Sequence, residues 1–96
     1  MRPSETLKIH RDAILNATKR FKVTNPRVFG SVLHGTDTEQ SDLDLLVDAL
    51  PGATLFDLGG FQEELQIILG VKVDVVTSGG LRNRFGEKIL AEAKPI

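Results

Sequence analysis

The sequence contains no cysteine, no tryptophan and no tyrosine, so its five phenylalanines are the only aromatic side chains. Without cysteine the chain can form neither a disulfide bond nor a cysteine-ligated zinc site. This absence suits a reducing compartment, and we expect a cytoplasmic protein. No run of basic residues surrounds the phenylalanines, which argues against a surface on which nucleic-acid bases would stack.

The chain also lacks an excess of either charge and lacks a long apolar run. Twelve Lys and Arg stand against 13 Asp and Glu, which gives a formal net charge of -1. Such a balance does not support direct binding of nucleic acid, whose phosphates are attracted by basic surfaces. No stretch approaches the ~20 apolar residues of a membrane span, and the amino end has no apolar run of the length that a signal peptide needs. We therefore predict no association with a membrane.

The length limits what a functional site can be attached to. With 96 residues, the chain is predicted to form one domain, residues 1–96. This is near the lower end of the sizes at which a hydrophobic core closes without a disulfide or a structural metal. We therefore expect no second domain that would hold a substrate.

Hydrophobic spacing predicts three helices, near residues 4–21, 57–69 and 81–93. Ser4 can cap the first helix, and Asn25-Pro26 is expected to break it. Asp57 can cap the second helix, which is expected to stop at Gly70.

Alternation of apolar with other side chains predicts three strands, over residues 27–29, 43–47 and 71–76. In the second strand, Leu43, Leu45 and Val47 share one face while Asp42 and Asp44 point the other way. The order helix, strand, strand, helix, strand, helix predicts an α/β fold, of the α+β kind, with helices on one face of a small mixed sheet. In that arrangement no helix is left to cover the acid-bearing face.

A motif of Gly30 and Ser31, ten further residues, and then Asp42 and Asp44 indicates the chemistry. The two carboxylates lie on one strand face with Cα atoms roughly 6–7 Å apart, and they repel unless a cation such as Mg²⁺ lies between them. Asp74 would add a third carboxylate if its strand lies beside theirs. Three acids can hold two ions, which is what a metal-dependent nucleotide site requires.

Each part of the motif has a purely structural alternative. An Asp-x-Asp at a strand start can cap a turn, and Gly30-Ser31 can be an ordinary tight turn. The functional interpretation is that glycine lets backbone N–H groups approach phosphate oxygens while the Ser31 hydroxyl adds a donor. The spacing of the parts, together with Asp74, favours function. Ser31 lacks the G-x-S-x-G setting of a serine hydrolase, and no G-x-x-x-x-G-K-[ST] phosphate loop is present.

Three segments resemble a known family: Gly30–Gly35 (GSVLHG), Ser41–Leu45 (SDLDL) and Val73–Val76 (VDVV). They are similar to the minimal nucleotidyltransferases of the DNA polymerase β superfamily. More narrowly, they resemble the MntA-like antitoxins that are encoded with a HEPN-domain toxin. The resemblance implies the nucleotidyltransferase fold, with the matching motifs lying between Gly30 and Asp74.

The resemblance also implies roles for individual residues. Gly30 and Ser31 would bind the triphosphate of ATP or another nucleotide. Asp42 and Asp44 would bind Mg²⁺, with two ions expected and Mn²⁺ as a possible substitute, and Asp74 would act as a metal ligand or general base. Antitoxins of this type transfer AMP from ATP to a tyrosine of the toxin. That tyrosine must come from the partner, because this chain has none.

Several other polar residues have weaker claims to function. Many relatives have arginine where this chain has His34, for which we favour a partly exposed loop histidine over a phosphate contact. Asp37, Glu39 and Asp48 are expected to be surface acids, although all three could tune the field around the metals. Arg82 and Arg84 are expected to be solvated.

Three functions remain open. The first is a protein adenylyltransferase that silences a toxin. The second is a binding module that neutralises its partner by masking it, with the enzymatic activity secondary or lost. The third is a catalytic fragment that acts on a hydroxyl of a small molecule, although such enzymes normally add a domain to hold the acceptor. We favour the first, because masking gives no reason for three acids.

Overall fold

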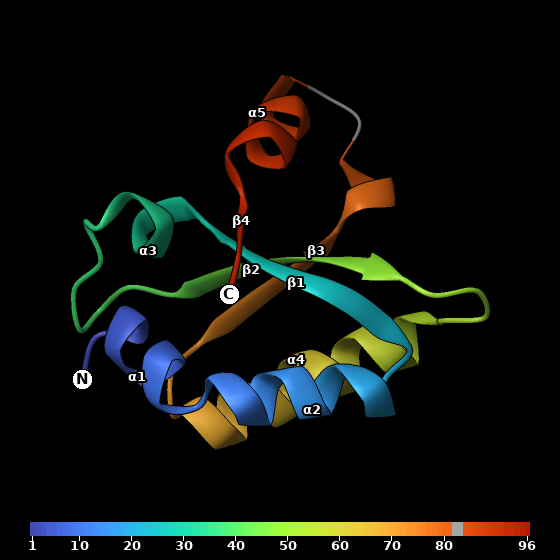
Figure 1. The fold of residues 1–96 in the computed structure, drawn as a ribbon, viewed down its shortest axis with the longest axis horizontal. Coiled ribbons are helices and arrows are strands. Elements are labelled where there is room, and N and C mark those ends of the chain that lie inside the picture. The colour runs from blue at the N-terminus through green and yellow to red at the C-terminus, as the bar shows by residue number, and fades with distance from the viewer. Residues whose placement is uncertain (82–83) are drawn as a thin grey trace.

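The computed structural model describes the backbone of residues 1–81 and 84–96 and the side chains of residues 1–81 and 86–96. Its sheet has four strands in the order β3-β2-β1-β4 (Figure 1). β2 (Leu43–Ala49) is parallel to β3 (Val73–Thr77), whereas β1 (Val23–Phe29) is antiparallel both to β2 and to the short β4 (Lys94–Pro95). The predicted mixed sheet is confirmed, with β4 as an additional edge strand.

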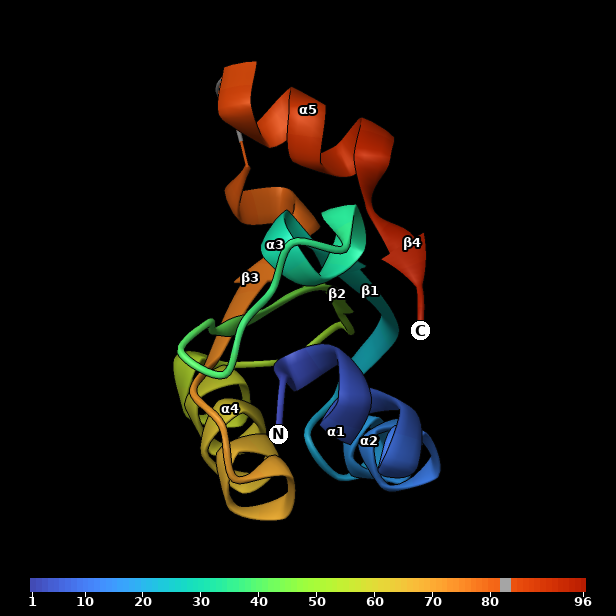
Figure 2. The ribbon, with the colours of Figure 1, turned by 90° about the vertical axis from the view of Figure 1, so that its left-hand side faces the viewer.

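Helices lie on both sides of this sheet (Figures 1 and 2). α1 (Pro3–Ile9), α2 (Arg11–Arg20) and α4 (Leu55–Leu69) form a layer on one face, as predicted. α3 (Gly30–His34) and α5 (Arg84–Glu92) lie on the opposite side. The α+β fold is therefore confirmed, but the placement of every helix on one face is not.

The acid-bearing face of β2 is partly covered, contrary to expectation. Leu46 lies on that face, two positions beyond Asp44, and it is fully buried. Both α3 and the short 3-10 helix η1 (Ser78–Gly80) contact β2. Periodicity shows which side of a helix is apolar but not which face of a sheet the helix will cover, so this cover could not be predicted locally.

The hydrophobic core lies between the sheet and the layer formed by α1, α2 and α4. The alternation predicted for β2 is confirmed, because Leu43, Leu45 and Val47 all face this core and are fully buried. The helices and the neighbouring strands contribute the other buried apolar side chains, which are Ile14, Ala17, Val23, Val28, Phe61, Leu65, Leu69 and Val73.

The amino-terminal third differs from the prediction. The expected single helix is interrupted at His10, which separates α1 from α2. Asn25-Pro26 does not break a helix but lies inside β1, where the pairing with β2 shifts register between Thr24 and Arg27. Asn25 has a φ of 53° there. Proline has no N–H to donate to a ladder, so an irregularity in the strand accommodates it.

The cap of α4 lies three residues earlier than predicted. Thr54 is the cap: its Oγ1 accepts a hydrogen bond from the Asp57 backbone N–H, and Asp57 Oδ2 accepts one from the Thr54 backbone N–H. This reciprocal pair satisfies donors that a helix start otherwise leaves free. The helix stops at Gly70 with a φ of 67°, as predicted.

Within the described parts of the chain, no helix is both long enough and apolar enough to cross a membrane. The expectations for the side chains of Arg82 and Arg84 lie outside the described residues.

Candidate active site

The sheet brings the predicted carboxylates together. β2 and β3 are neighbours, and their parallel register pairs Asp44 with Asp74. Asp42 precedes β2 on the same face, two positions before Asp44. The condition that the third acid lie on the strand beside the first two is therefore met.

The three carboxylates interact electrostatically. Burial, followed by the nearby charges of Asp74 and Asp42, raises the pKa of Asp44 from 3.8 to about 6. Each of these causes disfavours the ionised carboxylate. The cluster therefore has an excess of negative charge that a bound cation would offset.

Gly30 fits closely against Asp44. It follows Phe29, which pairs with Asp44 across β1 and β2, and its φ is 71°. A Cβ atom placed on Gly30 would collide with the Oδ2 atom of Asp44. Only glycine combines this left-handed backbone with this approach, so any side chain at the position would displace the carboxylate.

Ser31 and His34 lie on a short helix rather than in a loop. Gly30 begins α3, and Gly35 ends it with a φ of 70°. Ser31 is half-buried in the first turn. The side chain of His34 is 55% exposed, and its Nε2 lies 3.3 Å from Glu92 Oε2 on α5. The predicted exposure of His34 is confirmed, although its contact is an acid.

Lys72 is a residue of the site that the sequence analysis missed. Its Nζ lies 3.7 Å from Asp42 Oδ2, and its side chain is exposed. Its carbonyl accepts a hydrogen bond from the Leu43 N–H. Extending the parallel register by one residue places Lys72 beside Asp42. The sequence feature that could have identified Lys72 is its position as a basic residue directly before the strand that contains Asp74.

The donor set suits a hard divalent cation in its chemistry, because carboxylate oxygens are the ligands that Mg²⁺ prefers. Among the side chains described by the structure, no group of three His, Cys, Asp or Glu is close enough to hold a metal ion as it lies. The carboxylates of Asp42, Asp44 and Asp74 therefore lie near enough to influence one another's charge. They do not lie near enough to coordinate one ion together as they stand. Coordination by all three requires a change of side-chain rotamer.

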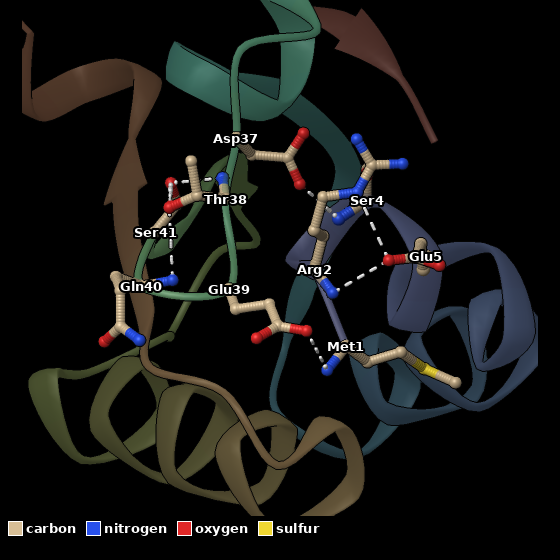
Figure 3. Close-up of polar contacts among 9 residues, drawn as sticks. All are labelled: Met1, Arg2, Ser4, Glu5, Asp37, Thr38, Glu39, Gln40 and Ser41. Atoms are coloured by element: carbon tan, nitrogen blue, oxygen red, sulfur yellow. Dashed lines mark hydrogen bonds and ion pairs between the residues drawn. The ribbon is translucent and has the colours of Figure 1, made fainter.

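Two acids expected at the surface have structural roles instead. Asp37 is only 5% exposed, and its Oδ2 accepts a hydrogen bond of 2.9 Å from the Ser4 backbone N–H at the start of α1 (Figure 3). This hydrogen bond holds the pKa of the Asp37 carboxyl below its usual range. The loop before β2 is thereby attached to α1.

Asp48 is the second of these acids. Its carboxylate accepts hydrogen bonds from Ser78 Oγ at 2.7 Å, from Asn25 Nδ2 at 3.1 Å and from the Arg27 guanidinium at 2.6 Å. The bonds from Ser78 and Asn25, together with the charge of Arg27, hold the pKa of Asp48 below its usual range. Asp48 therefore attaches the end of β3 to β1 and β2.

The comparisons with known proteins agree with this fold. The family described as "Nucleotidyltransferase domain" matches residues 11–96. The chain belongs to this family, and it is a nucleotidyltransferase.

Relatives within the family are more specific. The protein adenylyltransferase MntA of Thermococcus cleftensis is 35% identical, over 84% of this chain and 87% of its own length. A Methanocaldococcus jannaschii protein provisionally named protein adenylyltransferase MJ0126 is 30% identical, over 93% of this chain and 91% of its own. These relatives agree with the resemblance to MntA-like proteins found in the motifs.

Two solved structures share the fold. One, provisionally described as a minimal nucleotidyltransferase, has a TM-score of 0.86 and 44% identity and covers 97% of this chain and 95% of its own. The other, described as a toxin-antitoxin with AMP-PNP, has a TM-score of 0.74 and 21% identity over 88% of this chain and 69% of its own. The first matches nearly the whole chain, and the second extends the fold to a protein described with a toxin partner.

Proposed function

We propose that this chain transfers AMP from ATP to a tyrosine hydroxyl of a HEPN-domain toxin, with Mg²⁺ as cofactor, and so acts as an antitoxin in the cytoplasm. The observation that supports this most is the pairing of Asp44 with Asp74 beside Gly30, with a pKa of about 6 at Asp44. The names of the adenylyltransferase relatives support AMP as the transferred group, and the toxin-antitoxin structure supports the partner.

The proposed mechanism assigns a task to each residue. Asp42, Asp44 and Asp74 would hold one or two Mg²⁺ ions, which when bound neutralise triphosphate charge and lower the pKa of an attacking hydroxyl. Gly30 leaves the backbone open for the approach of phosphate oxygens, and the Ser31 hydroxyl can donate a hydrogen bond to them. Lys72 would add positive charge beside Asp42.

The transfer itself is a displacement at phosphorus. The tyrosine oxygen forms a bond to the α-phosphorus of ATP, the bond from that phosphorus to the β-phosphate oxygen breaks, and pyrophosphate leaves. The proton of the hydroxyl passes to the carboxylate of Asp74, which acts as general base. Without a bound cation, Asp44, which would hold Mg²⁺, is ionised mainly above a pH of about 6.

The experiment is a transfer assay with α-labelled ATP, Mg²⁺ and the toxin encoded next to this chain. We expect label on the toxin with the wild-type protein and a loss of at least a hundredfold in rate for Asp44→Asn and for Asp74→Asn, as for other groups that act directly on reacting atoms. Asp12→Asn is the matched control, because that carboxylate is 94% exposed on α2. Absence of label with the wild-type protein would refute the proposal.

Masking without catalysis is the second candidate, and one observation favours it: Leu55 and Phe56 expose large apolar side chains, as docking surfaces do. The double variant Asp42→Ala with Asp44→Ala separates the two functions. Full neutralisation of the toxin by this variant would establish masking, whereas loss of neutralisation with an intact complex would establish catalysis.

A further inference from the structure

The outer side of α4 has two large apolar side chains although it faces away from the core. Phe56 is 92% exposed and Ile67 is 76% exposed. With 3.6 residues per turn, Phe56, Gly59, Glu63 and Ile67 form a single stripe on the side of the helix opposite the buried Phe61. We call these four residues the outer stripe. Large apolar side chains opposite the core side of a helix are often covered by a partner, whereas among the residues that the structure describes nothing covers Phe56 and Ile67 to any large extent.

Packing among the described residues does not require glycine at position 59. In the next position, a Cβ atom on Gly60 would lie 2.7 Å from the Phe21 ring, so packing inside the molecule explains that glycine. At Gly59, a Cβ atom would meet nothing within 4 Å. Glycine weakens a helix relative to alanine, and its usual benefit is to let another chain come close. The bare backbone at the middle of the outer stripe therefore indicates an external contact.

The charge of α4 indicates what makes this contact. Its charged residues are Asp57, Glu63 and Glu64, with no Lys or Arg between Leu55 and Leu69. Asp57 belongs to the cap, and Glu64 Oε2 lies 2.6 Å from Arg20. Glu63 remains exposed within the outer stripe. Two copies of the stripe would bring like charges together, whereas an apolar partner with a Lys or Arg complements it.

We propose that the outer stripe docks an amphipathic helix of the toxin, one with large aliphatic side chains beside a Lys or Arg. This inference rests on the proposed antitoxin function. Phe56 and Ile67 would pack between the aliphatic side chains, Gly59 would allow the helices to approach closely, and Glu63 would pair with the basic residue. Leu55, 85% exposed beside the stripe, would extend the apolar contact.

The docking surface lies on α4, and the carboxylates lie on the face of the sheet opposite the core that α4 covers. α4 belongs to the layer below the sheet in the view of Figure 1, and α3, which begins at Gly30, lies above it. A toxin held by α4 therefore leaves the nucleotide site uncovered. Its tyrosine must reach the acids from a segment outside the docked helix, or from a second toxin molecule.

The test measures binding of the purified toxin by titration calorimetry to the wild-type chain and to Phe56→Gln and Gly59→Gln. Each variant is expected to bind at least about tenfold more weakly, because a docking surface concentrates its affinity in a few central contacts. Gly59→Gln is also expected to raise the melting temperature, since glutamine favours helix and the space is open. Weaker binding by a more stable protein cannot result from misfolding. Leu90→Gln, which changes a 39% exposed leucine on α5, is the matched control and should bind like the wild type.

Each other outcome is decisive. If the wild type binds the toxin and both variants bind within about twofold of it, the docking proposal is wrong while the antitoxin function stands. If the wild type neither binds nor labels the toxin, both proposals fail. If the wild type sediments as a dimer that Gly59→Gln converts to a monomer, the occupant is a second copy, and the toxin-docking proposal is wrong.

Discussion

Asp44 is half-buried beside two other carboxylates, and its pKa of about 6 shows that the fold disfavours its charge. Gly30 meets the same carboxylate from β1, where any side chain would collide with it. Asp44 has an electrostatic cost and Gly30 a steric constraint, and both residues lie where the proposed reaction takes place. Perturbed groups of this kind concentrate at functional sites.

The charge of Asp44 predicts how stability depends on pH. Between pH 3.8 and about 6 the folded protein retains the Asp44 proton that the unfolded chain has lost, so the contribution of Asp44 to the free energy of unfolding should fall as the pH rises through this window. In EDTA at pH 8, Asp44→Asn should be more stable than the wild type by on the order of 1 kcal/mol after allowance for solvent screening. Urea unfolding at pH 4 and pH 8 measures this, and an equal gain at both pH values would contradict it.

Substitutions at Gly30 and Gly35, which have similar backbone angles, should differ in their effect on AMP transfer. Gly30→Ala and Gly35→Ala should each cost about 1–2 kcal/mol, because both positions have a left-handed φ. Only Gly30→Ala should also abolish AMP transfer, since a Cβ atom at Gly35 meets nothing within 4 Å. Chemical unfolding and the transfer assay measure the two effects. Equal activity of the two variants would show that the contact with Asp44 is unimportant.

At the scale of the elements, neighbouring strands and the loops between them assemble the site. The positions of β2 and β3 could be predicted, because alternation has a period of two and survives in a short segment. The pairing of the acids followed on the condition that β3 lies beside β2. The first four residues of β1 were not predicted, since Asn25-Pro26 indicated a break. α3 could not be predicted, because its five residues are too few to show helical periodicity. The loop of residues 36–41 looked purely polar, yet Asp37 in it reaches α1.

The contact of Asp37 predicts a loss of stability when it is removed. Asp37→Ala should destabilise the fold by about 1 kcal/mol, which is typical for loss of a group that caps a helix. Because the pKa of Asp37 is lowered in the fold, its contribution is present above the pKa of the unfolded carboxyl and is lost as the pH falls through the folded value. Thermal unfolding at pH 7 measures the change, with the exposed Glu39→Ala in the same loop as control. Equal melting temperatures would refute the role.

At the scale of the whole molecule, the sheet separates the two sides to which the proposals assign functions. One side has the carboxylates with α3 and α5 nearby, and the other has the helical layer with the outer stripe of α4 (Figure 2). Binding on one side can therefore leave the other accessible. The extra negative charge on the first side should make the stability of the entire fold respond to divalent cations.

If a divalent cation binds only the folded state, it should reverse the order of stability of the wild type and Asp44→Asn. Mg²⁺ or Mn²⁺ at a hundred times its Kd should raise the free energy of unfolding of the wild type by about 2.7 kcal/mol. Asp44→Asn should gain much less, so its advantage in EDTA should disappear. Melting curves with and without the metal and a nucleoside triphosphate measure this. Equal gains by both proteins would place the metal elsewhere.

The sequence alone determined the elements whose pattern is local. These are the strand that alternates Leu43, Leu45 and Val47 with acids, the stop of α4 at Gly70, and the motif that identified the family. Tertiary structure decided what depends on contacts between distant segments: the collision that keeps position 30 glycine, the burial of Asp37 against α1, the ion pair of Lys72 with Asp42, and the crossing of α5 to the acid-bearing side. The physical reason is the distance along the sequence over which each effect acts. Side-chain alternation and capping act over a few residues, whereas burial and charge act between groups that only the folded chain brings together.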